Sequence, residues 1–384
     1  MTSTQYSRRD FSRAVVEAAA LAFATPGLRG AHAVNLAAPM AVPVTSQRIL
    51  LNFNENPYGP TPKALEALAK CGHVAARYPD AAYEQVRDAL ARTHEVKREN
   101  IVLGCGSTEI LRAADAAFLG PGQSIVVAET TFEAVLQYAR TTRATPVLVP
   151  MTSDHRHDLP KMAAECTSKT GLVYVCNPNN PTGTIVTRDE LADFVQRVPP
   201  TTLILVDEAY FHFAENPQYA SVIDWIGKYA NIVVARTFSK IYGMAGMRLG
   251  YGVGSKANVA AMDGQILRDN GNAAVLSAAL ASLTDQEHVT SCRARMNATR
   301  QWLVEELAKD GRTFIPSEAN FMMIDMGTDV APIIERFDAR NMLVGRRFPS
   351  MSNFLRITIG TQPEMEAFVT TLREIAPTRA SKAA

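Results

Sequence analysis

Two charged side chains stand where apolar runs of this sequence end, and both could do chemistry. Lys240 closes the run "NIVVARTF", and Asp207 closes "TTLILV". A lysine amine that is withdrawn from water loses its proton readily and then acts as a nucleophile or a base. A buried carboxylate is costly without a cationic partner, which is either another side chain or a ligand nitrogen. The plainer alternatives are an exposed strand-end charge and a structural ion pair.

Neutral hydrogen-bond donors follow neighbouring apolar runs. The turn "NPNNPTG" after "GLVYVC" contains Asn180, and Tyr210 lies three residues beyond Asp207. An amide and a phenol can both donate to a ligand oxygen. Asn, Pro and Gly together also form ordinary turns, so the motif alone permits both interpretations.

A third candidate is an anion site. The stretch "CGSTEILRAA" places Gly106 before a helix that we expect to begin at about Ser107. Free amide groups at a helix N-terminus bind phosphate, although a capped helix without a ligand is the alternative. Ser239 and Arg248 add a hydroxyl and a guanidinium. Together these residues predict an anion site.

The candidates need a scaffold that brings strand ends together. The runs "QSIVVAE", "TPVLVP", "GLVYVC", "TTLILVDEA", "NIVVARTF" and "LGYGVG" are almost wholly apolar, as strands buried on both faces are. Helical patterns such as "TEILRAADAAFL" and "RDELADFVQRV" alternate with them, which predicts an α/β sheet covered on both sides. Ligands bind beyond the carboxyl ends of the strands in such sheets.

A lysine amine, an acid for a ring nitrogen, donors for a phenolate oxygen and a phosphate cup are what pyridoxal phosphate requires. The sequence resembles fold-type I pyridoxal-phosphate enzymes in "NPNNPTG", "DEAYFHF" and "TFSKIYGMAGMRLGYGVG". It is similar to the histidinol-phosphate aminotransferase-like branch in "LNFNENPYGP", "RYPD" and "FLRITIGT", and the likeness runs from about Ile49 to about Ile375. The resemblance implies a large three-layer α/β/α domain with a mostly parallel sheet, a smaller α+β domain, and bound pyridoxal 5'-phosphate.

The resemblance also implies a role for each cofactor contact. Lys240 matches the lysine that forms a Schiff base with the cofactor, and Asp207 matches the acid at the ring nitrogen. Asn180 and Tyr210 match the donors to the phenolate oxygen. Phe132 in "ETTFEAVLQYA" matches the aromatic residue that stacks on the ring, although it could be a core residue. The phosphate-binding positions, where Thr108 replaces the aspartate of many relatives, are Gly106, Ser107, Thr108, Ser239 and Arg248.

Arginines would hold the substrate. Arg356 in "FLRITIGT" matches the arginine that takes the substrate carboxylate or an equivalent anion, and its planar fork suits that group. Either Arg346 or Arg347 would face the other end of the substrate. Tyr78 in "RYPD" matches a tyrosine that reaches the phosphate of the other subunit, which implies a homodimer with shared sites. Weaker pocket candidates are Asn56, Tyr58 and Asn320.

On this basis the chain divides into four segments. Residues 1–45 would be an export signal and linker, and residues 46–75 an N-terminal segment that packs with the small domain. Residues 76–287 would be the large cofactor-binding domain. Residues 288–384, which begin with the long helical stretch "SCRARMNATRQWLVEELAKDG", would be the small C-terminal domain.

The first segment resembles a twin-arginine export signal. In it "SRRDFSR" precedes a weakly apolar stretch and the small residues "AHA". Ser12 and Glu17 depart from the usual pattern, and a basic tail is the alternative. The resemblance predicts periplasmic delivery, and without a working signal the protein would be cytoplasmic.

Composition excludes several other classes of function. The formal net charge is +1, which gives no electrostatic footprint for nucleic acid or an anionic membrane. Five cysteines occur without a CxxC pair, so neither a zinc knuckle nor a disulfide framework is predicted. The stretch "SDHRHD" could suggest a metal, but His155 and His157 are spaced poorly for chelation. We expect a solvated loop there, a helix from about Asp158, and no metal.

The leading function is transamination between an amino donor and a 2-oxo acid. The donor would be an amino-alcohol phosphate like histidinol phosphate, or an amino acid, aromatic ones included. A decarboxylase or an oxidase could use the same residues, because the bond that breaks depends on how the substrate is oriented. A non-catalytic binding protein fits poorly with an intact Lys240 and Asp207. Export conflicts with cytoplasmic histidine biosynthesis, so fold analogy does not fix the donor.

Overall fold

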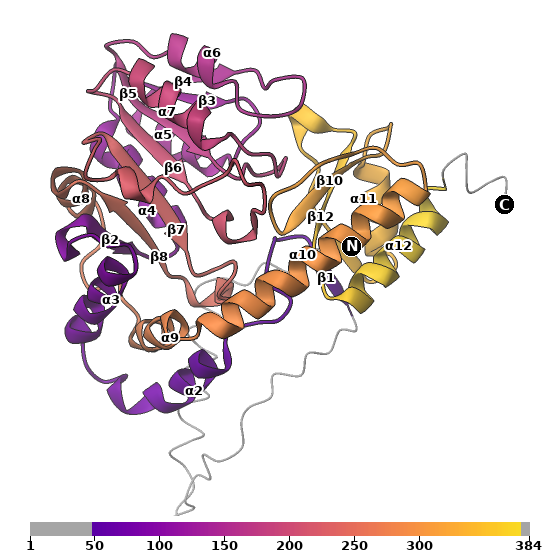
Figure 1. Cartoon of the computed structure of the whole chain (residues 1–384), viewed down its shortest axis with the longest axis horizontal. Coiled ribbons are helices and arrows are strands. Elements are labelled where there is room, and N and C mark those ends of the chain that lie inside the picture. Colours follow the sequence, from indigo (N-terminus) through magenta and orange to yellow (C-terminus); the bar gives the residue numbers. More distant parts are fainter. Residues whose placement is uncertain (1–47, 378–384) are drawn as a thin grey trace, which may run out of the picture. The chain divides into compact units, whose positions relative to one another are not determined.

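The apolar runs form one seven-stranded sheet in the computed structural model, which describes residues 48–377 (Figure 1). The strand order is β2-β8-β7-β6-β5-β3-β4, and β8 runs antiparallel to both of its neighbours while the other pairs are parallel. The strands are β2 (Ile101–Gly104), β3 (Ser124–Ala128), β4 (Thr145–Val149), β5 (Thr170–Cys176), β6 (Leu203–Asp207), β7 (Ile232–Thr237) and β8 (Gly250–Gly254). The predicted mostly parallel α/β sheet is confirmed.

Helices cover both faces of this sheet, because side chains alternate between the faces along each strand. One face packs against α4 (Ser107–Phe118), α5 (Ala134–Thr142) and α8 (Lys256–Asp263). The other face packs against α3 (Asp80–Thr93), α6 (Leu159–Ala164), α7 (Arg188–Arg197), α9 (Ala273–Leu283) and part of α10 (Gln286–Lys309), with α2 (Pro62–Lys70) against α9. The helix that we expected at about Ser107 is α4.

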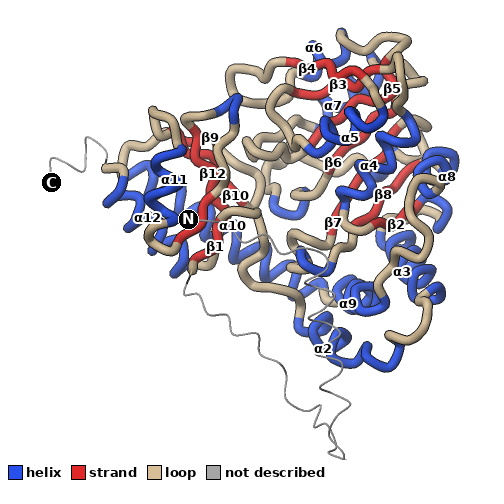
Figure 2. Tube along the Cα trace, turned by 180° about the vertical axis from the view of Figure 1, so that it is seen from behind, coloured by secondary structure: helices blue, strands red, loops and turns tan. Residues whose placement is uncertain are grey.

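A second group of strands and helices lies apart from the large sheet (Figure 2), and its side chains form a separate apolar cluster. Three antiparallel strands have the order β12-β10-β9, and β1 pairs in parallel with β11. Their bounds are β1 (Ile49–Leu51), β9 (Phe314–Ile315), β10 (Phe321–Asp325), β11 (Met342–Val344) and β12 (Phe354–Thr358). The helices α11 (Ala331–Asp338) and α12 (Gln362–Ile375) and the C-terminal part of α10 complete the group. The four segment boundaries expected from the sequence stay a prediction.

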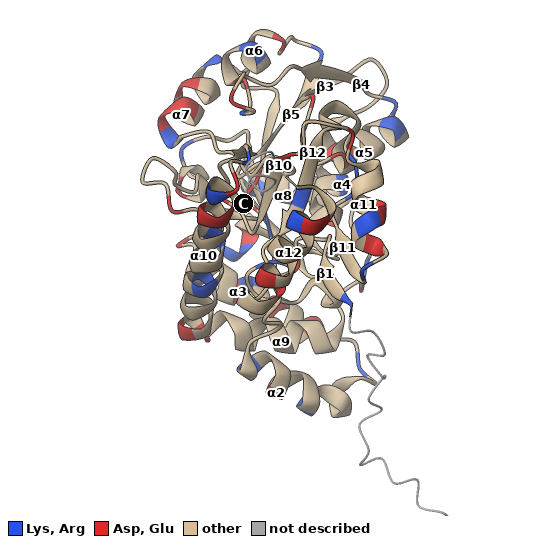
Figure 3. Ribbon diagram, turned by 90° about the vertical axis from the view of Figure 1, so that its right-hand side faces the viewer, with Lys and Arg blue, Asp and Glu red and all other residues tan. Residues whose placement is uncertain are grey.

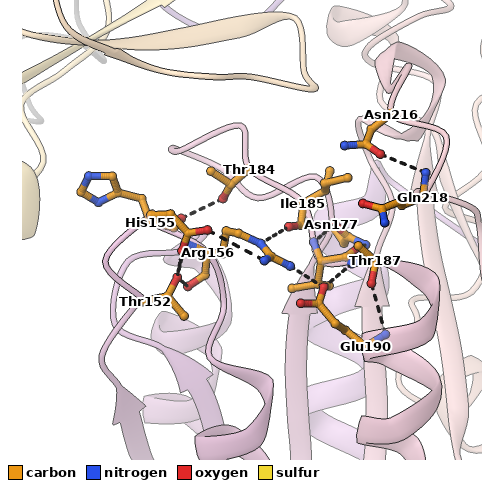
Figure 4. A network of polar contacts seen from close by, with 12 residues as sticks. Thr152, His155, Arg156, Asn177, Thr184, Ile185, Thr187, Glu190, Asn216 and Gln218 are labelled. Carbon is orange, nitrogen blue, oxygen red and sulfur yellow. Dashed lines mark hydrogen bonds and ion pairs between the residues drawn. The ribbon is translucent and has the colours of Figure 1, made fainter.

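The loop after β4 differs from the expectation. Asp158 does begin a helix, since its carboxylate accepts the Lys161 N–H at 3.2 Å and caps α6. His157, however, is buried and its Nε2 lies 3.0 Å from Asn179 Oδ1, so the expected solvated loop is wrong for this residue. Arg156 ties the loop to Glu190 on α7 and to the Ile185 carbonyl (Figure 4).

Charge is mixed over the surface of the described residues. Both basic and acidic residues occur on α7, α10 and α12 (Figure 3). Within residues 48–377 no helix is long and apolar enough to cross a membrane, and no group of three or more metal-ligating side chains gathers. The export signal predicted for residues 1–45 lies outside the described residues.

Candidate active site

Lys240 lies just beyond the carboxyl end of β7, at the edge where β5 and β6 also end. Its amine donates to the carbonyl oxygens of Asn54 at 2.9 Å and Phe53 at 3.2 Å. Burial, together with a smaller contribution from the positive charge of Arg356, lowers the pKa of this amine from 10.5 to about 8. The amine is therefore held in place and loses its proton easily.

Asp207 ends β6 and is 3% exposed. One carboxylate oxygen accepts the Tyr174 hydroxyl at 2.9 Å, and the other accepts the Ala209 N–H at 3.0 Å. Burial raises its pKa to about 6, while these two hydrogen bonds act in the opposite direction. No cationic side chain of residues 48–377 is bonded to this carboxylate, and such a buried group suits a ligand that brings its own positive charge.

The side chains of Asn180 and Tyr210, which the sequence predicted as hydrogen-bond donors to a ligand oxygen, lie next to each other. The Tyr210 hydroxyl lies 3.5 Å from Asn180 Nδ2 and 3.2 Å from Asn54 Nδ2. Burial raises the pKa of Tyr210, so the phenol keeps its proton. The Lys240 amine lies 5.4 Å from the centre of the Tyr210 ring. The amide, the phenol and the amine therefore share one site.

Arg356 enters this site from β12 and is 8% exposed. Its guanidinium donates to Asn180 Oδ1 at 2.8 Å and to the Asn52 carbonyl at 2.8 Å, while its buried Nε has no partner among the described residues. Burial lowers the pKa of Arg356 to about 10, which leaves it charged at neutral pH. A buried cation with an unused donor is a place for an anion.

The anion cup forms at the N-terminus of α4. Arg248 Nη2 lies 3.3 Å from Thr108 Oγ1, and Nη1 lies 3.3 Å from Ser239 Oγ. Gly106 has φ +77°, and a Cβ atom there would come within 2.2 Å of Arg248 Nη2. The cup thus depends on glycine, because a side chain at residue 106 would displace the arginine. The first helical residue, Ser107, adds its backbone amide.

Phe132 lies between β3 and α5 and packs, partly buried, on the face of the sheet that carries Tyr174. The neighbouring Thr131 hydroxyl donates to Asn179 Oδ1 at 2.8 Å, which fastens this segment to the turn that contains Asn180. The structure therefore ties the Phe132 and Asn180 segments to each other.

The remaining predicted residues lie in different surroundings. Arg347 points to Asp329, with contacts of 2.8 and 2.6 Å, and Arg346 pairs with Glu133 at 2.7 Å. Asn320 Nδ2 donates to the Asn54 carbonyl at 3.1 Å and so supports the segment that receives Lys240.

Asn56 and Tyr58 form contacts outside the cluster around Lys240. The Asn56 amide donates to the Ile241 carbonyl at 2.8 Å, and the ring of Tyr58 lies 3.9 Å from the Arg295 guanidinium. Tyr78 is 78% exposed.

Sequence reasoning did not include Tyr174, Asn54 or Glu133 in the site. Tyr174 lies within an apolar run, where an aromatic residue predicts only core packing. Asn54 lies in the quoted motif "LNFNENPYGP", and its φ of +55° turns the chain toward Lys240. Glu133 directly follows Phe132, and no sequence signal connected it with Arg346.

These residues fit pyridoxal phosphate. The cup offers a guanidinium, two hydroxyls and helix amides for a phosphate. The Arg248 guanidinium packs so closely against Gly106 that no side chain fits between them. Asp207 offers a buried carboxylate for a protonated ring nitrogen, and Lys240 offers an amine of lowered pKa for an aldehyde. The fold and the site together define a fold-type I pyridoxal-phosphate enzyme.

Comparison with known proteins gives the family. Residues 46–372 match the family described as "Aminotransferase class I and II". The chain is 38% identical over 339 residues to the histidinol-phosphate aminotransferase of Moorella thermoacetica, with 85% of each chain covered. It is 36% identical over 333 residues to that of Brevibacillus brevis, covering 85% of this chain and 90% of the relative.

A solved structure agrees with these relatives. The histidinol-phosphate aminotransferase from Sinorhizobium meliloti, in complex with pyridoxal-5'-phosphate, superposes with a TM-score of 0.80 at 27% identity. The superposition covers 85% of this chain and 90% of that one. The chain belongs to the class I and II aminotransferases. It is a transaminase that uses pyridoxal 5'-phosphate and passes an amino group from an amino donor to a 2-oxo acid.

Proposed function

We propose that this transaminase acts on an amino donor whose anionic group binds Arg356, and that histidinol phosphate is the first candidate donor. The observation that carries this proposal is the buried, charged Arg356 with an unused Nε, next to Asn180. The names of the relatives support the phosphate ester as the substrate.

In the proposed mechanism each side chain has one task. When bound, the cofactor supplies an aldehyde that takes up the donor's amino group and a ring that accepts the electron pair left by the departing α-proton. Lys240 receives that proton on Nζ and returns it, since a pKa near 8 makes the amine a usable base at neutral pH. Asp207 holds the ring nitrogen, and Asn180 and Tyr210 hold the ring oxygen. Phe132 covers the ring, and the cup of Gly106, Ser107, Thr108, Ser239 and Arg248 holds the phosphate.

A second candidate donor is an α-amino acid, because of how the neighbouring arginines are paired. Glu133 balances the charge of Arg346, and Asp329 balances that of Arg347. Of these three arginines, Arg356 alone forms no ion pair with an acidic side chain within residues 48–377. A single unbalanced positive charge suits one carboxylate better than a doubly charged phosphate. Exposed ion pairs are weak, so a phosphate could still compete for Arg346.

We further propose that the enzyme is a homodimer. The exposed ring of Tyr78 and the resemblance of "RYPD" to a tyrosine that reaches the neighbouring subunit support this. We also propose that the protein is exported by a twin-arginine signal. The motif "SRRDFSR", which precedes the residues that the structure describes, supports this proposal. It is tested by replacing Arg8 and Arg9 with lysine, which should retain the protein in the cytoplasm.

A donor screen tests the proposed substrate. Purified holoenzyme is given 2-oxoglutarate and either histidinol phosphate or one of the amino acids, and the products are identified by mass spectrometry. A keto product with glutamate supports transamination, whereas released CO₂ or H₂O₂ would indicate the decarboxylase or oxidase alternative. We expect kcat/KM for histidinol phosphate to exceed that of every amino acid. A better amino acid donor would establish the second candidate, and Lys240→Ala serves as the inactive control.

A further inference from the structure

The tyrosine that contacts Asp207 has no task in the mechanism above. Tyr174 is 0% exposed and lies on β5, and its hydroxyl is 2.9 Å from Asp207 Oδ2. A phenol in an apolar interior needs a hydrogen-bond partner, and the carboxylate is the partner that the structure provides. Because an ionised carboxylate can only accept, the hydroxyl must donate.

The sheet itself fixes this contact. Strands β5 and β6 pair in parallel, with Tyr174 opposite Leu205 and Cys176 opposite Asp207. Side chains two residues apart on a strand share a face, so the Tyr174 ring reaches the end of the neighbouring strand. The Cys176 thiol lies on the same face but bonds to the Pro178 carbonyl at 3.4 Å. Within residues 48–377, Tyr174 is the one side chain that donates to Asp207.

We propose that Tyr174 is a positioning residue that keeps the Asp207 carboxylate ionised and aimed at the ring nitrogen of the cofactor. The inference rests on the proposed role of Asp207. A proton shared between the Asp207 carboxylate and a ring nitrogen lies on whichever of the two groups is the stronger base. Each donor to the carboxylate weakens its hold on that proton, so the Tyr174 hydroxyl shifts the proton to the nitrogen. Glu208 and Lys240 also influence the carboxylate by charge, with opposite signs.

The test replaces Tyr174 with phenylalanine, which keeps the ring and removes only the hydroxyl. The enzyme is loaded with cofactor labelled with ¹⁵N in the ring, and the nitrogen signal is compared with that of the parent. We expect it to move toward the unprotonated position. We also expect the dissociation constant of the cofactor to rise roughly 10-fold and kcat to fall about 10- to 100-fold, with KM nearly unchanged.

Tyr251→Phe is the matched control. Tyr251 is also a buried tyrosine of this sheet, but its hydroxyl lies 2.9 Å from His94 Nε2, on the opposite face from Asp207. The nitrogen signal of the labelled cofactor in Tyr251→Phe should equal that in the parent enzyme. An unchanged nitrogen signal and cofactor affinity in Tyr174→Phe would overturn the proposal.

A double-mutant cycle separates this inference from the role of Asp207. In an Asp207→Asn background the effect of Tyr174→Phe on cofactor affinity should largely vanish, and an undiminished effect would show general packing instead. If Asp207→Asn alone leaves the nitrogen signal unchanged, the proposed role of Asp207 fails. Should Tyr174→Phe not fold, 3-fluorotyrosine at this position keeps the hydroxyl as a stronger donor. It should move the signal the opposite way, and no movement would overturn the inference.

Discussion

The lowered pKa of Lys240 makes a quantitative prediction for the enzyme without cofactor. At pH 7, a pKa of about 8 leaves roughly one amine in ten uncharged, against roughly one in three thousand for an amine at the ordinary 10.5. Lys240 should therefore react with an amine-directed reagent about 300-fold faster, for the same access, than an ordinary lysine. The advantage should shrink to nearly nothing at about pH 11, where both amines are largely neutral.

Competitive labelling measures this directly. Apoenzyme is exposed to trace acetic anhydride from pH 6 to 11, and the acetylated peptides are quantified by mass spectrometry. The exposed Lys169 serves as the internal reference for reagent strength. The labelling of Lys240 should level off just above pH 8. In Arg356→Gln the inflection should move to higher pH, because the positive charge that helps to lower the pKa is gone. An inflection near 10.5 in the parent would refute the reasoning from burial.

Three further predictions concern single residues. Burial raises the pKa of the Asp115 carboxyl group on α4 to about 8, and neither of its oxygens has a hydrogen-bond partner within residues 48–377. The folded state therefore loses stability as pH rises from about 4 to 8. Asp115→Asn should remove this loss of stability, which is about 4 kcal/mol at pH 7. The thermal midpoint of the variant should exceed that of the parent by more at pH 8 than at pH 5. An equal difference at the two pH values would contradict the raised pKa of Asp115. Arg356→Lys should lower kcat/KM about 10- to 1000-fold in steady-state assays without weakening cofactor binding, because a single ammonium cannot replace the guanidinium fork. Asp207→Asn should retain cofactor, measured by absorbance after dialysis, but lose roughly 100-fold or more in kcat.

The strand ends were predictable because apolar runs of this length mark buried strands, and residues that follow parallel strands meet at one edge. Lys240, Asp207 and Asn180 come together for that reason. Arg248 could be proposed for the anion site from its type and position, but not its path to the cup, because the residue itself adopts a left-handed backbone conformation with φ +63° after the turn Ala245–Met247.

Other parts of the site depend on contacts that no local pattern encodes. Arg346 and Arg347 are adjacent in sequence, yet one pairs with Glu133 and the other with Asp329. The directions of these two side chains depend on how the segment after β11 packs against the segments that contain Glu133 and Asp329. Burial of His157 likewise follows from its bond to Asn179, a partner 22 residues away. A polar loop sequence gives no sign of such a distant partner.

The central claim is that Lys240 is the residue that bonds the cofactor in this transaminase. Holoenzyme is reduced with borohydride and digested, and the mass of the cofactor is located among the peptides. The account predicts a single adduct on the peptide that contains Lys240, and none in Lys240→Ala treated in the same way. An adduct on another lysine of the parent enzyme, or one that persists in Lys240→Ala, would contradict it.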